Sequence, residues 1–183
     1  MQELLDKWNI KLDYNTLLSM WNESHRHYHN QNHLLDLINQ INENKESFGS
    51  QVNYEKMVLC ALFHDCIYDP MRNDNEEKSA EFFESCCQDK NKDIQEIKQM
   101  IIDTKTHEST TKLSEKFNHL DMSIVERDFD QLLEWERGIG QEYKAYGELY
   151  KIGRLNFLES LLDKYPHNTD NLLKLVDWVK TNY

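Results

Sequence analysis

The chain has 183 residues, 39% hydrophobic and 11% aromatic, which is enough for one sizeable core and within the usual range for a single domain. We therefore expect one domain over residues 1–183. Its 21 Lys and Arg against 33 Asp and Glu give a formal charge of −12. This charge argues against an extended nucleic-acid or anionic-membrane surface, because both kinds of binding need excess cations.

The low content of turn-forming residues predicts an all-α fold, a helical bundle. The sequence has only five glycines and two prolines, too few for the many turns of an all-β chain. No stretch approaches the roughly twenty apolar residues of a membrane span, and the opening does not resemble a signal peptide, so we expect a cytoplasmic protein. The four cysteines lack the spacing of zinc or redox sites, and we expect free thiols.

Apolar residues at helical spacing predict helices along most of the chain. The first covers 14–21 behind an Asp13 cap, and the second starts near Tyr28 and carries His29 and His33. The third is the very apolar stretch "YEKMVLCALFHDCIY", with Asn53 as its cap, which ends before Pro70. Later helices are expected over 76–87, 94–106, 129–150, 155–165 and 170–179.

Two clusters of ionisable residues fall on these expected helices. His29 and His33 are four residues apart, which places them on one face of a helix. His64 and Asp65 lie at the end of the most apolar helix, where both need partners because an unpaired buried charge is costly. From the residues alone, a polar helix face and a hydrogen-bonded His-Asp pair remain alternatives to a metal site.

The order of these motifs resembles a known superfamily. A histidine, a His-Asp pair and a distant aspartate, here His33, His64, Asp65 and Asp121, resemble the ligand order of HD-domain metal-dependent phosphohydrolases. The segments "RHYHNQNHLLDLI", "ALFHDCIYDPMRNDNEEKSA", "IIDTKTH" and "YKIGR" resemble the bacterial family of predicted metal-dependent HD-superfamily phosphohydrolases. This likeness covers about residues 26–154. It implies an HD-type helical domain in which those four residues bind metal.

A more distant likeness concerns the stretch "YHNQNH". It is similar to a motif of cyclic-nucleotide phosphodiesterases, which are also HD proteins, with "HD", "TKTH" and "HLDMS" following in the same order. In those enzymes the first histidine protonates the leaving oxygen and the second binds metal. The likeness implies that His29 is a general acid and His33 a ligand, while the neighbouring His27 is expected to be a bystander.

The remaining candidates surround these motifs. Glu76 either accepts a hydrogen bond from water at the metal or serves as a first-turn acid that favours the helix dipole. Asp65 is expected to act in catalysis as well as in metal binding, because it can bridge a second cation. The residues expected to contact substrate are Arg26, Tyr28, Arg72, Lys105, His107 and Arg154.

These features predict a metal-dependent phosphohydrolase that acts on a nucleotide or another small phosphate ester through an activated water. We expect one divalent cation, with two not excluded; Mn, Mg, Co, Ni, Fe and Zn are all candidates. One alternative is a non-catalytic HD module that binds nucleotide or metal. Another is a di-iron HD oxygenase, which would need His107 and His119 as further ligands. The sequence leaves a homodimer open.

Overall fold

The computed structural model describes all residues 1–183 and is built from helices alone, with one isolated β-bridge between Ile10 and Cys87. The predicted all-α class is confirmed. The chain divides into two compact units, unit 1 (Met1–Asp121) and unit 2 (Met122–Tyr183). The single domain expected from chain length stays a prediction.

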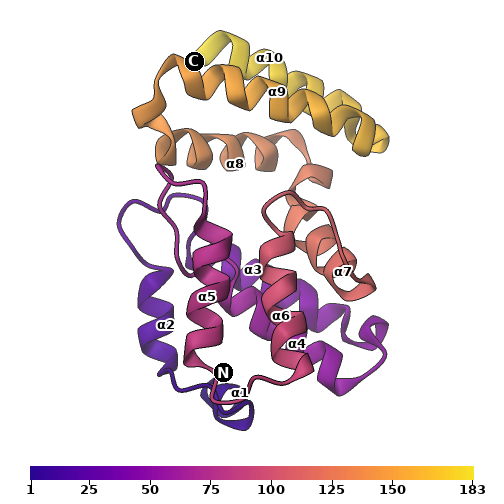
Figure 1. Cartoon of the computed structure of the whole chain (residues 1–183). Helices are drawn as coiled ribbons and strands as arrows, with labels where there is room; N and C mark the ends of the chain where they lie inside the picture. The colour runs from indigo at the N-terminus through magenta and orange to yellow at the C-terminus, as the bar shows by residue number, and fades with distance from the viewer. The chain divides into compact units, whose positions relative to one another are not determined.

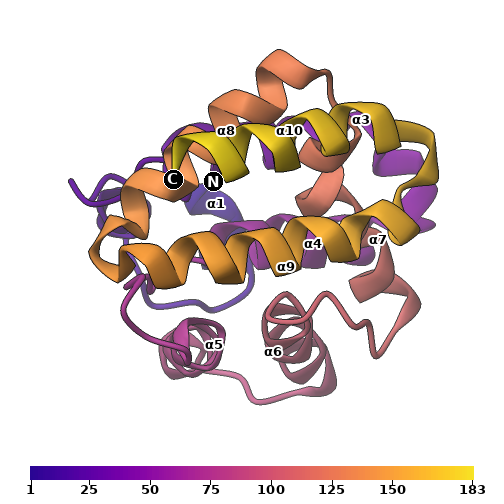
Figure 2. The ribbon, with the colours of Figure 1, turned by 90° about the horizontal axis from the view of Figure 1, so that it is seen from above.

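Unit 1 contains seven α-helices and one 3₁₀ helix. They are α1 (Gln2–Lys7), α2 (Tyr14–Met20), α3 (Gln31–Glu43), η1 (Lys45–Phe48), α4 (Gln51–Phe63), α5 (Asn75–Cys86), α6 (Lys92–Asp103) and α7 (Lys112–Asp121). Helix α4 packs against α3, α6 and α7, and α5 runs beside α6 (Figures 1 and 2). Residues 55–63 of α4 are all buried. The apolar run in the sequence therefore forms the centre of this unit.

The start of α3 differs from the expectation. The helix begins at Gln31, because the Asn30 side chain accepts a hydrogen bond from the backbone N–H of Asn32 and takes the N-cap position. His29 therefore lies in the loop before the helix, while His33 lies in its first turn. The predicted placement of both histidines one turn apart on a single helix is wrong.

Helix α4 begins and ends earlier than expected. Ser50 rather than Asn53 caps it, by accepting a hydrogen bond from the Asn53 backbone N–H. The helix ends at Phe63, well before Pro70, because Ser79 of α5 offers other partners: its Oγ accepts from the N–H of Ile67 at 3.1 Å and lies 3.2 Å from the Ile67 carbonyl. His64 is the C-cap, as its expected place at the helix end required.

Helices α5 and α6 match the expectation within a few residues, but α7 was not predicted. Its apolar residues Leu113, Phe117 and Leu120 are buried. Thr111 and Ser114 exchange hydrogen bonds between side chain and backbone at its start, as in a capping box. This helix supplies Asp121 to the site.

Unit 2 contains three α-helices and three 3₁₀ helices. They are η2 (Met122–Glu126), α8 (Phe129–Glu142), η3 (Lys144–Tyr146), α9 (Glu148–Lys164), η4 (Pro166–Asn168) and α10 (Thr169–Asn182). Helix α10 packs against α8 and α9, and Figure 2 shows α9 and α10 running alongside each other. The expected helix over 129–150 is interrupted: α8 ends at Glu142, and Gly147, with φ 54° and ψ −130° outside helical geometry, precedes the start of α9.

Two further expectations concern the whole chain. All four cysteines are free thiols, as predicted. Burial raises the pKa of Cys66 and of Cys87 to about 12, which keeps both as unreactive thiols. None of the helices combines the length and the apolar character that crossing a membrane requires.

Candidate metal centre

Three helices of unit 1 bring His33, His64 and Asp121 together. His33 comes from the first turn of α3, His64 is the C-cap of α4, and Asp121 is the last residue of α7. Each offers one ligand atom, and these atoms all lie within 4.8 Å of one another. Three of the four residues that the HD resemblance implied as metal ligands, although far apart in the chain, thus lie close together.

The distances within this cluster are short. The Oδ1 atom of Asp121 lies 3.1 Å from Nε2 of His33 and 3.5 Å from Nε2 of His64. All three side chains are largely shielded from water, with 8%, 1% and 11% exposed for His33, His64 and Asp121. Two nitrogens and one carboxylate oxygen around one point form a donor set typical of divalent transition metals.

His64 shows most clearly that a cation fits this cluster. Its Nδ1 lies 3.0 Å from the carbonyl oxygen of Ala61, which can only accept, so Nδ1 carries the proton. Its Nε2 is buried and has no hydrogen-bond partner, although carboxylate oxygens of Asp65 and Asp121 lie 3.3 and 3.5 Å away. In neutral His64 a lone pair would face two anions, and a metal ion between them would remove that repulsion.

The electrostatics of the cluster follow from this geometry. Burial by itself would lower the pKa of His64, but the carboxylates of Asp65 and Asp121 outweigh it and hold that pKa well above its usual value. Burial would likewise raise the pKa of Asp121, but the charge of His64, followed by hydrogen bonds from His107 and His33, holds that pKa well below its usual value. The cluster therefore requires positive charge at its centre, from a proton or from a metal.

Asp65, the fourth expected ligand, lies at the edge of this cluster. Its Oδ2 is 3.3 Å from Nε2 of His64, but its oxygens are not part of the set whose atoms lie within 4.8 Å of one another. Burial would raise its pKa, and the charge of His64, with a smaller contribution from His29, lowers it below the usual range. Its assignment as a ligand stays a prediction.

The candidate general acid lies beside the cluster, although not on the helix where it was expected. The ring of His29 has its centroid 4.5 Å from that of Tyr68 and 6.2 Å from that of His33. The Tyr28 ring lies 5.0 Å from the His33 ring and 5.1 Å from the His29 ring. The loop before α3 therefore places both residues next to a metal-ligand candidate, and their roles toward substrate stay predictions.

Glu76 lies in the first turn of α5 and is half-buried. Burial raises its pKa, and the negative charge of Asp65 adds to that effect, while its own backbone N–H and the charge of Lys105 oppose it. A carboxylate near the site with a raised pKa is suited to proton transfer. Its place in the first turn of α5 also fits the alternative of a helix-dipole acid, and its role in catalysis stays a prediction.

His107 reaches the opposite oxygen of Asp121. Its Nε2 lies 3.3 Å from Oδ2 of Asp121, whereas Oδ1 faces His33 and His64. His107 lies four residues beyond the end of α6 and has φ 54°, a conformation that non-glycine residues adopt rarely. Its observed partner is a metal-ligand candidate; the substrate contact that the sequence indicated stays a prediction.

Two expected phosphate-binding cations form ion pairs at the surface. The Nε and Nη2 atoms of Arg72 donate to the two carboxylate oxygens of Asp74, at 2.8 and 2.7 Å. The Nζ of Lys105 lies 2.5 Å from a carboxylate oxygen of Glu77 and 2.5 Å from the carbonyl of Asn73. Either cation would have to leave its carboxylate to bind a phosphate.

Two other arginines that were expected to contact substrate are buried. The side chain of Arg26 is 0% exposed, and its N–H groups donate to Glu23 and to three backbone carbonyls, which leaves no donor for a ligand. Arg154 belongs to unit 2, where its Nε donates to the fully buried Glu136 at 2.6 Å and its guanidinium lies over the Trp135 ring. The contacts of Arg26 therefore serve the structure. Arg154 has a buried Nη2 without a hydrogen-bond partner, and the substrate contact expected of it stays a prediction.

The aromatic residues around the cluster carried no signal for it in the sequence. The Trp21 ring lies 5.4 Å from the His64 ring, and its Nε1 donates to the carbonyl of Leu62. The Phe117 ring also packs against His64, with its centroid 5.5 Å from that of the His64 ring. His119 lies two residues before Asp121 and is exposed on α7, so the di-iron alternative loses one of its two extra ligands.

Comparison with known proteins adds no family assignment: no family model, curated protein or solved structure matches the chain.

Proposed function

We propose that the chain is a metal-dependent phosphohydrolase of the HD type, acting on a nucleotide or another small phosphate ester. The single observation that carries this proposal is the convergence of His33, His64 and Asp121, with a buried Nε2 of His64 that has no hydrogen-bond partner. The motif order of the sequence supports the same conclusion, because these residues occupy the ligand positions that the HD resemblance implies.

In this proposal His33, His64 and Asp121 hold one divalent cation, and Asp65 is the candidate for a fourth ligand. The cation would supply Lewis acidity, which lowers the pKa of water and polarises a phosphoryl oxygen. The protein contributes the orientation of the ligands: the Ala61 carbonyl fixes the tautomer of His64, and His107 holds the oxygen of Asp121 that faces away from the histidines.

Two side chains outside the ligand set would then move protons. His29 donates a proton to the departing oxygen of the ester, a contribution of about 10²- to 10⁴-fold in rate. Glu76, with its raised pKa, takes up the proton that the attacking water releases. The Tyr28 ring lies next to the His33 ring and offers an aromatic face on which a base can stack.

One observation favours a second function, a non-catalytic module that binds a metal. The cations of unit 1 that were expected to hold phosphate are engaged by the protein itself: Arg72 by Asp74, Lys105 by Glu77, and Arg26 by Glu23. A binding module needs no catalytic acid. Replacement of His29 would then leave metal affinity unchanged.

The test is a phosphate-release screen with the purified chain loaded in turn with Mn²⁺, Co²⁺, Ni²⁺ and Mg²⁺. Nucleoside mono-, di- and triphosphates, cyclic nucleotides and sugar phosphates form the substrate set. We expect turnover with at least one metal, loss of turnover in His64→Gln, and a reduction of about 10²-fold or more in His29→Gln. Silence of the parent protein with every metal, together with tight metal binding, would favour the non-catalytic module.

A further inference from the structure

The guanidinium group of Arg26 is fully enclosed and fully hydrogen-bonded. Its Nε and Nη2 donate to one carboxylate oxygen of Glu23, at 3.1 and 3.0 Å. Its Nη1 donates to the backbone carbonyl of His29 at 2.9 Å and to that of Asp65 at 2.8 Å, and Nη2 also donates to that of Cys66 at 3.2 Å. Five N–H groups thus make five hydrogen bonds, the full donor capacity of an arginine.

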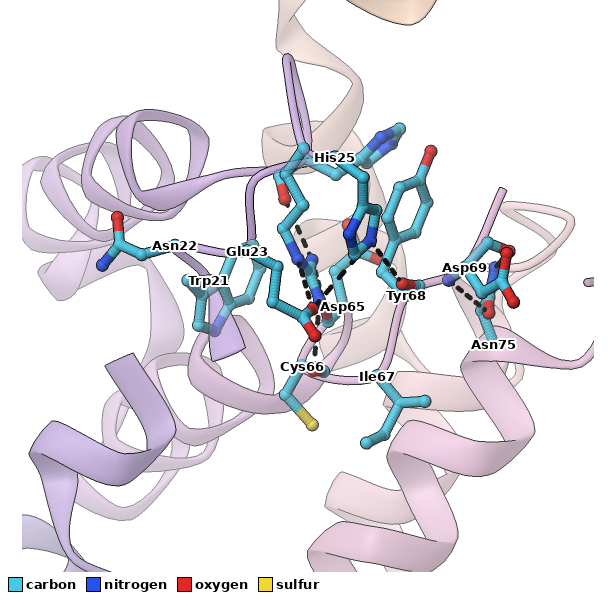
Figure 3. Close-up of polar contacts among 12 residues, drawn as sticks. Trp21, Asn22, Glu23, His25, Asp65, Cys66, Ile67, Tyr68, Asp69 and Asn75 are labelled. Atoms are coloured by element: carbon cyan, nitrogen blue, oxygen red, sulfur yellow. Dashed lines mark hydrogen bonds and ion pairs between the residues drawn. The ribbon is translucent and has the colours of Figure 1, made fainter. Parts of the chain in front are cut away.

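The three backbone acceptors belong to two segments whose relative position must be fixed for the proposed chemistry. One carbonyl is that of His29, the candidate general acid, in the loop before α3. The other two follow His64 directly, in the turn that ends α4. Figure 3 shows Glu23, Asp65 and Cys66 gathered in this region. A single side chain therefore joins the loop of the proton donor to the turn of the metal-ligand candidates.

Aromatic rings hold the guanidinium from two directions. Its central carbon lies 5.6 Å from the centroid of the Trp21 ring and 5.1 Å from that of the Tyr68 ring, both within range of a cation–π contact. Trp21 is itself anchored through Nε1 to the Leu62 carbonyl at 3.0 Å, and the Tyr68 ring contacts the His29 ring. The arginine therefore has little freedom to move toward a ligand.

We propose that Arg26 is a positioning residue that fixes His29 relative to the turn formed by His64 and Asp65. This inference rests on the proposed function, since it assigns the role through His29. A lysine would not replace Arg26, because an ammonium group has at most three donors and lacks the planar fork that reaches three carbonyls and a carboxylate together.

Two variants test the role. Arg26→Lys keeps the charge and removes the fork. Glu23→Gln removes the carboxylate charge that pairs with the guanidinium but keeps a side-chain oxygen that can accept a hydrogen bond from it, and this variant serves if Arg26→Lys does not fold. The matched control is Arg137→Lys, the same substitution at an exposed arginine of unit 2 whose guanidinium lies over the Trp178 ring.

The first measurement is backbone hydrogen exchange of the intact chain, which needs no activity and no metal. In Arg26→Lys we expect the amides of Asn30, Cys66 and Ile67 to exchange at least about tenfold faster, because both segments lose their common anchor. Glu23→Gln should show a smaller increase at the same amides, and Arg137→Lys none. Unchanged exchange there in both Arg26→Lys and Glu23→Gln would overturn the proposed tie.

The second measurement compares two substrates that differ in their need for a proton donor. 4-Nitrophenyl phosphate releases a stable anion, whereas a nucleoside 5′-monophosphate releases an alkoxide that must be protonated. Misplacement of His29 should lower kcat for the nucleotide at least about tenfold more than for the aryl ester. An equal loss on both esters, with faster exchange, would mean a purely structural tie and overturn the positioning role.

The two proposals can fail separately. If the parent chain hydrolyses no compound of the phosphate-release screen with any metal, the proposed phosphohydrolase activity is contradicted, and with it the action through His29. The exchange measurement then still decides whether Arg26 ties the two segments together. If the parent is active and only the substrate comparison fails, the proposed function stands and the role of Arg26 falls.

Discussion

Binding of a divalent cation should stabilise the folded chain strongly, and His64→Gln should remove that effect. The ligand candidates come from α3, α4 and α7, so a cation would link three helices of unit 1 and would bind the unfolded chain poorly. At a free concentration of about 100 times its Kd, such a ligand stabilises the folded state by about 2.7 kcal/mol.

The expected shift in melting temperature follows from that free energy. For chains of this size, each kcal/mol corresponds to about 2–4 °C, so saturating metal should raise Tm by about 5–11 °C. The assay is thermal unfolding followed by far-UV circular dichroism, after chelator treatment and again after addition of Mn²⁺ or Zn²⁺. In His64→Gln the shift should fall to less than about 2 °C, because the buried Nε2 that faces both carboxylates is gone.

The matched control is His119→Gln. This residue lies on α7 only two positions from Asp121 and is exposed, so the substitution removes a histidine without touching the cluster. The parent shift should be retained in full. An equal metal-induced shift in His64→Gln and in the parent would refute the reasoning, because the stabilising metal would then bind elsewhere.

Three other predictions concern stability. In Arg154→Met the fully buried carboxylate of Glu136 loses its ion-pair partner, and the free energy of unfolding in urea should fall by about 3–5 kcal/mol; a loss under 1 kcal/mol would contradict this. Gly147→Ala should cost about 1–3 kcal/mol in the same assay, because φ 54° with ψ −130° disfavours a side chain; an unchanged midpoint would show that the loop relaxes. Without metal, the pKa of His64 is raised above its ordinary value of 6.5, so its contribution to stability is complete below pH 6.5 and is lost as the pH rises toward the raised pKa. The pKa of Asp121 is lowered below its ordinary value of 3.8, so its contribution is complete above pH 3.8 and is lost as the pH falls toward the lowered pKa. Metal-free protein should therefore melt progressively lower above pH 6.5, and a flat profile there would contradict the proton-bridged cluster.

Much of the site was predictable because its strongest signals are local. The apolar run before His64 required a buried helix, and two ionisable residues at its end required partners. The His-Asp pair is found at that helix end, as expected, and the distance between Asp121 and the two histidines agrees with the ligand order that the HD resemblance implied.

The failed predictions arose where a side-chain contact decides a boundary. Asn30 caps α3 and thereby places His29 in a loop; asparagine is among the preferred N-cap residues, so that signal was present in the sequence. The exchange of hydrogen bonds between Thr111 and Ser114, followed by buried Leu113 and Phe117, likewise marked the start of α7. In both places the helix boundaries were predicted from the longer pattern of apolar residues rather than from these capping residues.

The role of the arginines could not be predicted from the sequence. A phosphate-binding site and a buried ion pair use the same residue type, and only tertiary contacts distinguish the two. Arg26 meets three backbone carbonyls, and Arg154 meets Glu136 from a different helix of unit 2. No spacing rule connects these partners, because the contacts depend on how loops and helices pack.

The most direct test of the central claim is anomalous diffraction from crystals of the chain grown with Zn²⁺. We predict one strong peak within about 2.0–2.2 Å of a nitrogen of His33, a nitrogen of His64 and an oxygen of Asp121. A peak at another place in the chain, or no peak at this cluster with saturating Zn²⁺, would contradict the account.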